Sequence, residues 1–291
     1  MRLLASNALQ VIVALLTAYL FFTLSQCPEQ ERSARSVYAD PATMTPPATV
    51  SPDSLHDERT QAPAGAPPVL SRVDPIVIEH GPRDERVVAL TFDACSTREP
   101  SKYDERITEV LIQTQTPATL FLGGKWMAEE AEQTKRLAAN PLFELGNHTY
   151  LHPHMREVSD ERIREELQST QNIMDSLTGK SATLFRPPYG EYDDRVVRIA
   201  ASLGLKTVQF DLASGDPDPA IGKEKLISYV SSMVRNGSIV VLHINQRGWH
   251  TAEALPGIIS RLRQRGFVFK TVSKMIHDAT PAQGQTNQVG N

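Results

Sequence analysis

Short apolar runs alternate with amphipathic helical segments over residues 72–278 of this chain, and that order leaves few folds open. One predicted helix starts at Ser159 and ends before Gly179, a second passes through residues 196–203, and a third ends before Gly266. This alternation predicts an α/β fold, with a parallel sheet or barrel and helices outside it. Chemistry in such folds collects at the carboxyl ends of the strands. The predicted strands are residues 87–92, 118–122, 205–210, 238–243 and 267–272.

The composition fits one sizeable domain with appendages. The chain has 291 residues, of which 40% are hydrophobic and 22% charged, which is enough for a real core. Its net charge is -4, and its lysines and arginines are scattered along the sequence. This pattern lacks the basic cluster of a nucleic-acid-binding protein, so we expect no DNA or RNA partner.

The N-terminus predicts export from the cytoplasm. Arg2 precedes an uncharged run over residues 3–24, which is typical of an export signal or a membrane anchor. The apolar part is longer than a usual cleaved signal core and no small-x-small cleavage site follows, so an uncleaved anchor is favoured. Residues 24–27 weakly resemble a lipoprotein cleavage box, but Gln26 stands where a small residue is expected, which disfavours lipidation of Cys27.

These features divide the chain into four parts. Residues 1–27 are a signal or membrane anchor, 28–71 a Pro-rich disordered linker, 72–278 the catalytic domain and 279–291 a disordered tail. The expected location is extracytoplasmic, in the periplasm or at the cell surface, either membrane-anchored or secreted. The chain has two cysteines, so no disulfide framework stabilises the domain, and its stability must come from the core.

Polar residues with metal and proton chemistry stand at the ends of the predicted strands. Asp93 follows the run that ends at Phe92, and His243 closes the run over residues 238–243. His148 and His152 are four residues apart, and two imidazoles at this spacing can bind one metal ion, for which Zn²⁺ is well suited. An isolated pair of this kind is more often a pair of polar loop residues, so the metal-site interpretation depends on the other motifs found with it.

The ordered set of motifs resembles the NodB-homology polysaccharide deacetylases, carbohydrate esterase family 4, over residues 82–276. It comprises Thr91-Phe92-Asp93, the pair in residues 148–152, Arg186-Pro187-Pro188-Tyr189-Gly190 and Leu242-His243. The resemblance implies a distorted (β/α) barrel and a hydrolase that removes acetyl groups from N-acetylglucosamine units. The partner would be a polysaccharide, such as peptidoglycan, a chitin-like polymer or an exopolysaccharide, and the cofactor a divalent metal, with Zn²⁺ favoured. A related alternative is an esterase acting on O-acetylated glycans.

The same resemblance assigns roles to single residues. It implies that Asp93 is the general base, that Arg186 holds this carboxylate ionised, and that the main-chain N–H of Tyr189 donates to the oxyanion. His148 and His152 become the metal ligands, and His243 the acid that protonates the leaving amine.

A general acid needs a partner that sets its pKa, and the sequence offers two candidates. Asp216 is assigned to orient His243, with Asp211 as the substitute. In the resemblance, residues 213–217 correspond to a family motif, Asp-Ser-x-Asp-Trp, of which this chain keeps Asp216 and lacks the first aspartate and the tryptophan. Phe210 and Leu242 could supply part of the apolar wall around the acetyl methyl. Trp249 could stack on a sugar face, with core packing as the open alternative.

One position departs from the family motif. The motif reads Thr-Phe-Asp-Asp, and its second aspartate completes a His-His-Asp metal triad, whereas this chain carries Ala94 there. Three repairs are open: Asp93 could turn to the metal, Cys95 could supply a thiolate, or extra waters could complete the coordination. Successive side chains leaving a strand point to opposite sides, which weighs against Cys95. If no repair holds the metal, the chain is a degenerate, non-catalytic glycan-binding relative.

Overall fold

The structure is a computed structural model and describes residues 74–97 and 101–279. The chain divides into two units, 1–63 and 64–291, and every described residue belongs to the second. The predicted membrane segment, the linker and nearly all of the predicted tail therefore lie outside the described residues. Within the described ranges, no helix combines the length and apolar character needed to cross a membrane.

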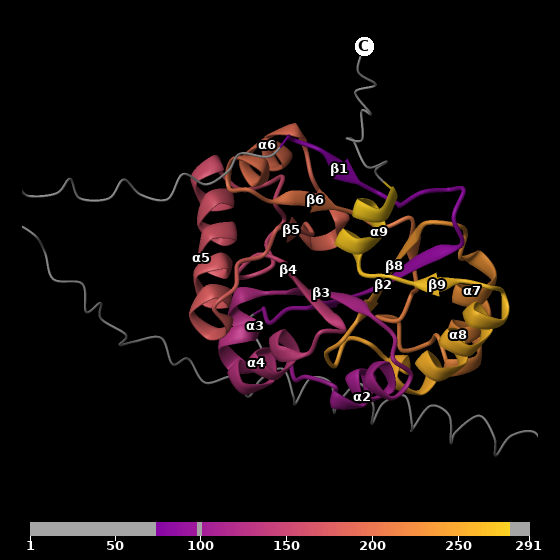
Figure 1. Ribbon diagram of the computed structural model, residues 1–291. Coiled ribbons are helices and arrows are strands. Elements are labelled where there is room, and N and C mark those ends of the chain that lie inside the picture. The colour runs from indigo at the N-terminus through magenta and orange to yellow at the C-terminus, as the bar shows by residue number, and fades with distance from the viewer. Residues whose placement is uncertain (1–73, 98–100, 280–291) are drawn as a thin grey trace, which may run out of the picture. The chain divides into compact units, whose positions relative to one another are not determined.

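The described residues form a curled, parallel sheet surrounded by helices (Figure 1). The strand order is β1-β6-β5-β4-β3-β2-β8-β7, and β9 also pairs with β2. Every pair of strands in this sheet is parallel. The strands are β1 (Val77–Ile78), β2 (Val87–Ala94), β3 (Ala118–Leu122), β4 (Phe143–Asn147), β5 (Leu184–Phe185), β6 (Lys206–Val208), β7 (Leu212–Ala213), β8 (Ser238–His243) and β9 (Val268–Phe269).

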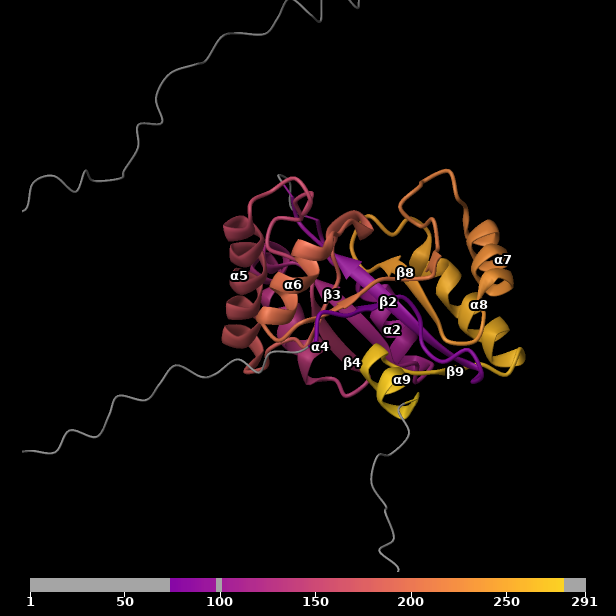
Figure 2. The same cartoon turned by 90° about the horizontal axis from the view of Figure 1, so that it is seen from above.

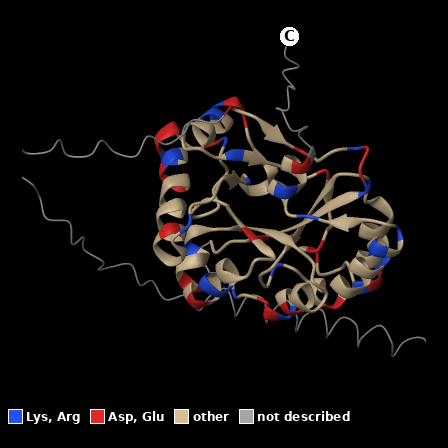
Figure 3. Cartoon of the chain, in the orientation of Figure 1, with Lys and Arg blue, Asp and Glu red and all other residues tan. Residues whose placement is uncertain are grey.

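The helices lie outside this sheet, with α5 and α6 at one side and α7 and α8 at the other (Figure 2). Acidic and basic residues are interspersed on their outer surfaces (Figure 3). Parallel strands with helices between them confirm the predicted α/β class, in the form of a half-barrel. The helices are α2 (Glu105–Gln113), α3 (Gly124–Glu129), α4 (Ala131–Ala139), α5 (Asp160–Thr178), the short 3₁₀ helix η1 (Pro188–Gly190), α6 (Asp194–Ser202), α7 (Lys223–Met233), α8 (Thr251–Gln264) and α9 (Val272–Ala279).

Local sequence signals explain most of these boundaries. Helix α5 begins after Ser159, whose hydroxyl accepts a hydrogen bond from the Arg162 N–H, and ends at Gly179, which has φ of 68°. Strands β2, β3 and β8 lie where the apolar runs predict them. The run over residues 267–272 is only partly a strand, because Val272 already begins α9 and packs its side chain into the core.

Strand β4 was missed by sequence reasoning because Glu144 and Gly146 are poor strand formers. The glycine is required by a close approach of a neighbouring ring. A Cβ built at Gly146 would lie 2.5 Å from Cδ1 of Phe121, which is its register partner on β3. The Phe121 ring in turn lies 4.1 Å from the Arg186 guanidinium carbon. Because Gly146 has no side chain, the Phe121 ring can lie close to β4, in the position where it contacts the buried Arg186 guanidinium.

The substitution Gly146→Ala should destabilise the domain by about 1–3 kcal/mol, because the new methyl group overlaps the Phe121 ring. Chemical denaturation of the two proteins measures this difference. Gly222→Ser is the matched control: it also adds a side chain, but into open space at the N-cap of α7, where serine is favoured. Equal stability of Gly146→Ala and the parent protein would show that the ring can move freely.

Candidate active site

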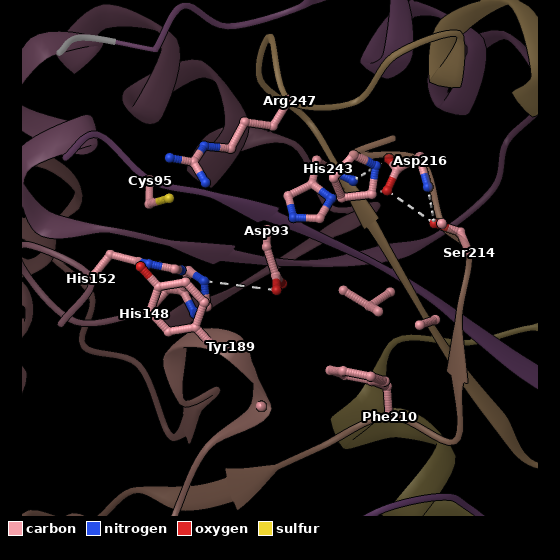
Figure 4. Close-up of a pocket in the computed structure, with 15 residues that line it drawn as sticks. Asp93, Cys95, His148, His152, Tyr189, Phe210, Ser214, Asp216, His243 and Arg247 are labelled. Carbon is pink, nitrogen blue, oxygen red and sulfur yellow. Dashed lines mark hydrogen bonds and ion pairs between the residues drawn. The ribbon is translucent and has the colours of Figure 1, made fainter. Parts of the chain in front are cut away.

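A pocket of about 320 Å³ lies where β2 and β8 end, on the carboxyl side of the sheet. Asp93 and His243 are register partners on these adjacent strands, so both side chains reach the pocket at the same level. In Figure 4 the Asp93 carboxylate lies between the His148 and His152 rings on one side and His243 on the other. The structure therefore brings together four of the residues that sequence reasoning singled out.

Asp93 is held by a fully buried arginine. Nη1 of Arg186 donates to Oδ1 of Asp93 at 2.8 Å and to the Thr91 hydroxyl at 2.7 Å, and Nη2 donates to the Gln209 carbonyl at 3.1 Å. Burial alone would raise the pKa of Asp93, but the positive charge of Arg186 is the chief factor that holds this pKa below its ordinary value. Asp93 is therefore an ionised carboxylate at neutral pH, as a proton acceptor must be.

The two histidines of the predicted metal site lie on a rigid loop after β4. The Asn147 side chain accepts from the Thr149 N–H at 2.9 Å, and the buried Glu166 carboxylate accepts from the N–H groups of residues 150 and 151, both at 2.7 Å. Thr149 and His152 have φ of 64° and 59°, and these strained values are fixed by that hydrogen bonding. The loop thus directs both rings into the pocket, as the sequence predicted.

Both rings are neutral. Burial lowers the pKa of His148, and it lowers the pKa of His152 to about 3. Nδ1 of His148 donates to the Arg186 carbonyl at 2.8 Å, which leaves Nε2 with its lone pair 3.7 Å from Oδ2 of Asp93. Nδ1 of His152 is buried and makes no hydrogen bond to any described residue. Two neutral imidazoles with free nitrogens are suitable ligands for a divalent metal ion.

The third protein ligand is not supplied by the residues around them. Ala94 is fully buried and carries no oxygen, and no group of three or more His, Cys, Asp or Glu side chains in the described ranges is arranged to hold a metal ion. Cys95 lines the pocket, but burial raises the pKa of its thiol to about 11, so it is protonated there at neutral pH. The pocket thus fits a divalent ion through two imidazoles and does not complete a three-ligand site.

His243 is paired with Asp216 and not with Asp211. Nδ1 of His243 donates to Oδ1 of Asp216 at 2.9 Å, and the main-chain N–H of His243 donates to Oδ2 at 2.8 Å. Burial alone would lower the pKa of His243, but the hydrogen bond and charge of Asp216 raise it above its ordinary value. Asp211 instead forms an ion pair with Arg83 at 2.8 Å and accepts from the N–H of Ile239, near the amino end of β8. The substitute prediction for Asp211 is therefore wrong, because that carboxylate lies at the opposite end of the strand.

Of the three predicted substrate-binding residues, one lines the pocket and two do not. Phe210 lines the pocket, whereas Leu242 is fully buried in the core and does not. Side chains alternate along β8, so Val241 and His243 face the pocket and Leu242 faces away, and Val241 takes the place predicted for Leu242. Trp249 is half exposed and lies outside the pocket lining, so its contact with sugar remains a prediction.

Tyr189 borders the pocket with its backbone in the left-handed region, at φ 58° and ψ 6°. Its ring packs edge-on against His152, with 4.5 Å between ring centroids, and stacks on His154 at 4.2 Å. The Tyr189 N–H makes no hydrogen bond to a described residue, which leaves it free for a ligand. Its role as an oxyanion donor is thus sterically open and remains a prediction.

Sequence reasoning missed several polar residues of this site. The Ser214 hydroxyl donates to Oδ1 of Asp216 at 2.9 Å, and the Thr251 hydroxyl donates to Oδ2 at 2.8 Å. Ser214 lies two residues before Asp216 in the sequence, whereas Thr251 lies outside the motifs and carries no sequence signal. Arg247 also lines the pocket, within the loop that follows β8, and only its proximity to His243 in the sequence hinted at it.

Comparisons with known proteins agree with this geometry. The family model described as polysaccharide deacetylase matches residues 80–208. A peptidoglycan-N-acetylglucosamine deacetylase from Bacillus cereus is 30% identical over 67% of this chain and 90% of its own length. The uncharacterized protein YlxY from Bacillus subtilis is 29% identical over 72% of this chain, and the match spans 63% of that relative. A solved structure from Bacillus anthracis, titled a pseudoenzyme of family CE4, has a TM-score of 0.63 and 28% identity, covering 70% of this chain and 69% of that one.

The substitution Asp216→Asn should lower the pKa of His243, because it removes the anion that offsets the burial of the ring. NMR titration of the His243 ring measures this directly. In any activity that needs the protonated imidazole, the alkaline limb of the pH profile should move to lower pH. Asp211→Asn is the matched control and should leave the His243 titration in place, since Asp211 pairs with Arg83. Equal titration of His243 in Asp216→Asn and the parent protein would contradict this assignment.

Proposed function

Because this chain belongs to the polysaccharide deacetylase family, carbohydrate esterase family 4, we propose that it hydrolyses N-acetyl groups of an N-acetylglucosamine-containing polysaccharide such as peptidoglycan. The observation that carries this proposal is a pair of opposed, oriented proton-transfer groups. Asp93 with Arg186 forms a proton acceptor, and His243 with Asp216 forms a proton donor, on adjacent strands at one register. This pairing of an ionised carboxylate with an imidazole whose pKa is raised by Asp216 suits the two proton transfers of amide hydrolysis.

In the proposed reaction, Asp93 accepts a proton from the water that attacks the acetamide carbonyl. Arg186 keeps the carboxylate ionised and fixes its direction, and the Thr91 hydroxyl and the Gln209 carbonyl fix the guanidinium. The free N–H of Tyr189 donates to the oxygen that becomes negative. His243 gives its proton to the departing nitrogen, while Asp216 stabilises the imidazolium and holds its orientation.

A divalent metal, with Zn²⁺ favoured, would be held by His148 and His152. When bound, such an ion lowers the pKa of a water molecule and polarises a carbonyl. With two protein ligands in place of three, we expect weak binding, and therefore activity that depends on the concentration of added metal.

The proposed location is extracytoplasmic, with attachment to a membrane through the N-terminal segment. The uncharged run over residues 3–24 and the Pro-rich stretch over 28–71 support it. A polymer outside the cytoplasm would then be within reach of a tethered domain.

The alanine at position 94 favours a second candidate function, that of a non-catalytic glycan-binding module. Ala94 removes a metal ligand, and the chain is similar to a Bacillus anthracis protein titled a pseudoenzyme. The alternative is a non-catalytic module that binds glycan through the same pocket. Esterase activity on O-acetylated glycans is the remaining option and uses the same groups.

Acetate release from N-acetylglucosamine oligomers and peptidoglycan, with excess Zn²⁺ present, tests the catalytic proposal. Asp93→Asn and His243→Ala should each lower the rate by about 10²–10⁴-fold, because each removes one proton-transfer group. Asp211→Asn, which alters a carboxylate away from the pocket, should leave the rate unchanged. Glycan binding without acetate release would favour the non-catalytic module, and release from acetylated xylan alone would favour the esterase.

The substitution Ala94→Asp should raise the affinity for Zn²⁺ by at least about tenfold, because it restores the aspartate that the family motif carries at this position as its third metal ligand. Titration calorimetry on the apo protein measures it. Cys95→Ser in the parent protein tests whether the Cys95 thiolate replaces the missing third ligand. An unchanged affinity for Zn²⁺ excludes Cys95 as a ligand, and a large loss of affinity identifies it as one. An Ala94→Asp protein with unchanged affinity would show that position 94 does not face the metal site.

A further inference from the structure

One cation in the pocket is not used by the proposed reaction. Arg247 is an exposed residue that lines the pocket, and its guanidinium makes no hydrogen bond or ion pair with any described residue. In Figure 4 the Arg247 guanidinium extends over Cys95, on the side of the pocket away from Phe210. An arginine that projects into a ligand pocket without an anionic partner leaves five N–H donors for a ligand.

The loop that carries Arg247 is rigid. Asn245 is fully buried, donates to the Cys95 carbonyl at 3.1 Å and accepts from the Arg247 N–H at 3.2 Å. The Trp249 N–H donates to the Asp216 carbonyl at 3.0 Å. Gly248 packs so closely that a Cβ there would lie 2.5 Å from the His243 carbonyl oxygen. The loop is thus fastened to the residues around the proton donor, so a ligand of Arg247 need not order the backbone.

The other charges around the pocket are already balanced. Asp93 pairs with Arg186 at 2.8 Å, and Asp216 pairs with His243 at 2.9 Å. Cys95, over which the Arg247 guanidinium extends in Figure 4, is a protonated thiol because burial raises its pKa to about 11. Among the residues that line the pocket, Arg247 is therefore an uncompensated positive charge.

The two sides of the pocket differ in polarity. Phe210 and Val241 line one part of the wall with apolar surface, whereas Arg247 supplies a cation on another. The volume of about 320 Å³ is at the lower end for ligand pockets and fits about one sugar unit with its substituents. An anionic group that reaches Arg247 must then lie on the sugar that carries the acetamide, or directly beside it.

We propose that Arg247 binds a carboxylate carried by the substrate sugar, so that the pocket selects N-acetylated sugars bearing a carboxyalkyl ether over neutral ones. Guanidinium and carboxylate match in a bidentate, charge-assisted pair, which gives both affinity and orientation. This inference rests on the proposed function for the identity of the sugar, but the binding step does not require turnover.

Titration calorimetry on the full chain in EDTA tests the proposal. The ligands are a disaccharide of N-acetylglucosamine and N-acetylmuramic acid, whose lactyl group supplies the carboxylate, and its methyl ester. The acid should bind at least about tenfold more tightly than the ester, and added salt should reduce the difference. Arg247→Gln should remove the preference and Arg247→Lys should retain part of it. Arg261→Gln, which removes an exposed cation from α8, should leave it intact.

The outcomes separate this inference from the proposed function. Equal binding of acid and ester, no binding of either, or a preference that survives Arg247→Gln overturns the role of Arg247. An equal loss of acetate release from both ligands in Arg247→Gln, with binding unchanged, also overturns it, since the guanidinium would then act at the reacting carbonyl. An Arg247-dependent preference for the acid in a protein that releases no acetate supports the inference and overturns the catalytic proposal instead.

Discussion

The buried ion pair between Asp93 and Arg186 is the interaction on which the rest of the site depends. Arg186 follows β5, yet its guanidinium reaches the end of β2, the Thr91 hydroxyl and the Gln209 carbonyl after β6, and it lies on the Phe121 ring of β3. One side chain thus connects four strand ends. Removing one partner of such a pair leaves an unpaired buried charge, at a typical cost of about 3–5 kcal/mol. The same contacts position the base and hold the half-barrel together.

This pair also explains how the pocket tolerates Ala94. The charge of Asp93 is balanced by a protein cation, so the carboxylate needs no metal ion to remain ionised. The His148 ring is fixed through its hydrogen bond to the Arg186 carbonyl, again without a metal. Loss of one ligand therefore weakens metal binding without disturbing the groups that transfer protons.

Two loops that are held by hydrogen bonds to buried side chains lie around the Asp93–Arg186 ion pair. The loop after β4 is held by the buried Glu166, and the loop after β8 is held by Asn245 and by the carbonyl and carboxylate of Asp216. Asp216 thereby has two tasks: it sets the pKa of His243 and fixes the loop that presents Arg247. In the proposed function this couples the placement of the substrate to the state of the proton donor, because both depend on one carboxylate.

Local pattern was sufficient for much of the fold. The continuous apolar runs of β2, β3 and β8 and the capping residues of α5 are properties of neighbouring residues, and the sequence predicted these elements and their boundaries well. Strand β4 was not predicted, because Gly146 serves a ring on another strand and lowers the local strand propensity. For the site, the motif order predicted Asp93, His148, His152, Arg186 and His243 as neighbours, and the structure places them around one pocket or in direct contact with it.

The sequence by itself determined which chemical groups are available: the imidazoles of His148 and His152, the carboxylate of Asp93, the imidazole of His243 and an alanine at position 94. Tertiary structure alone decided that Asp216 and not Asp211 pairs with His243, that Val241 and not Leu242 lines the pocket, and that Arg247 faces it without a partner. The physical reason is that ionisation and affinity depend on distances between side chains from different strands and loops. Those distances are fixed by sheet register and loop packing, which no local stretch of sequence encodes.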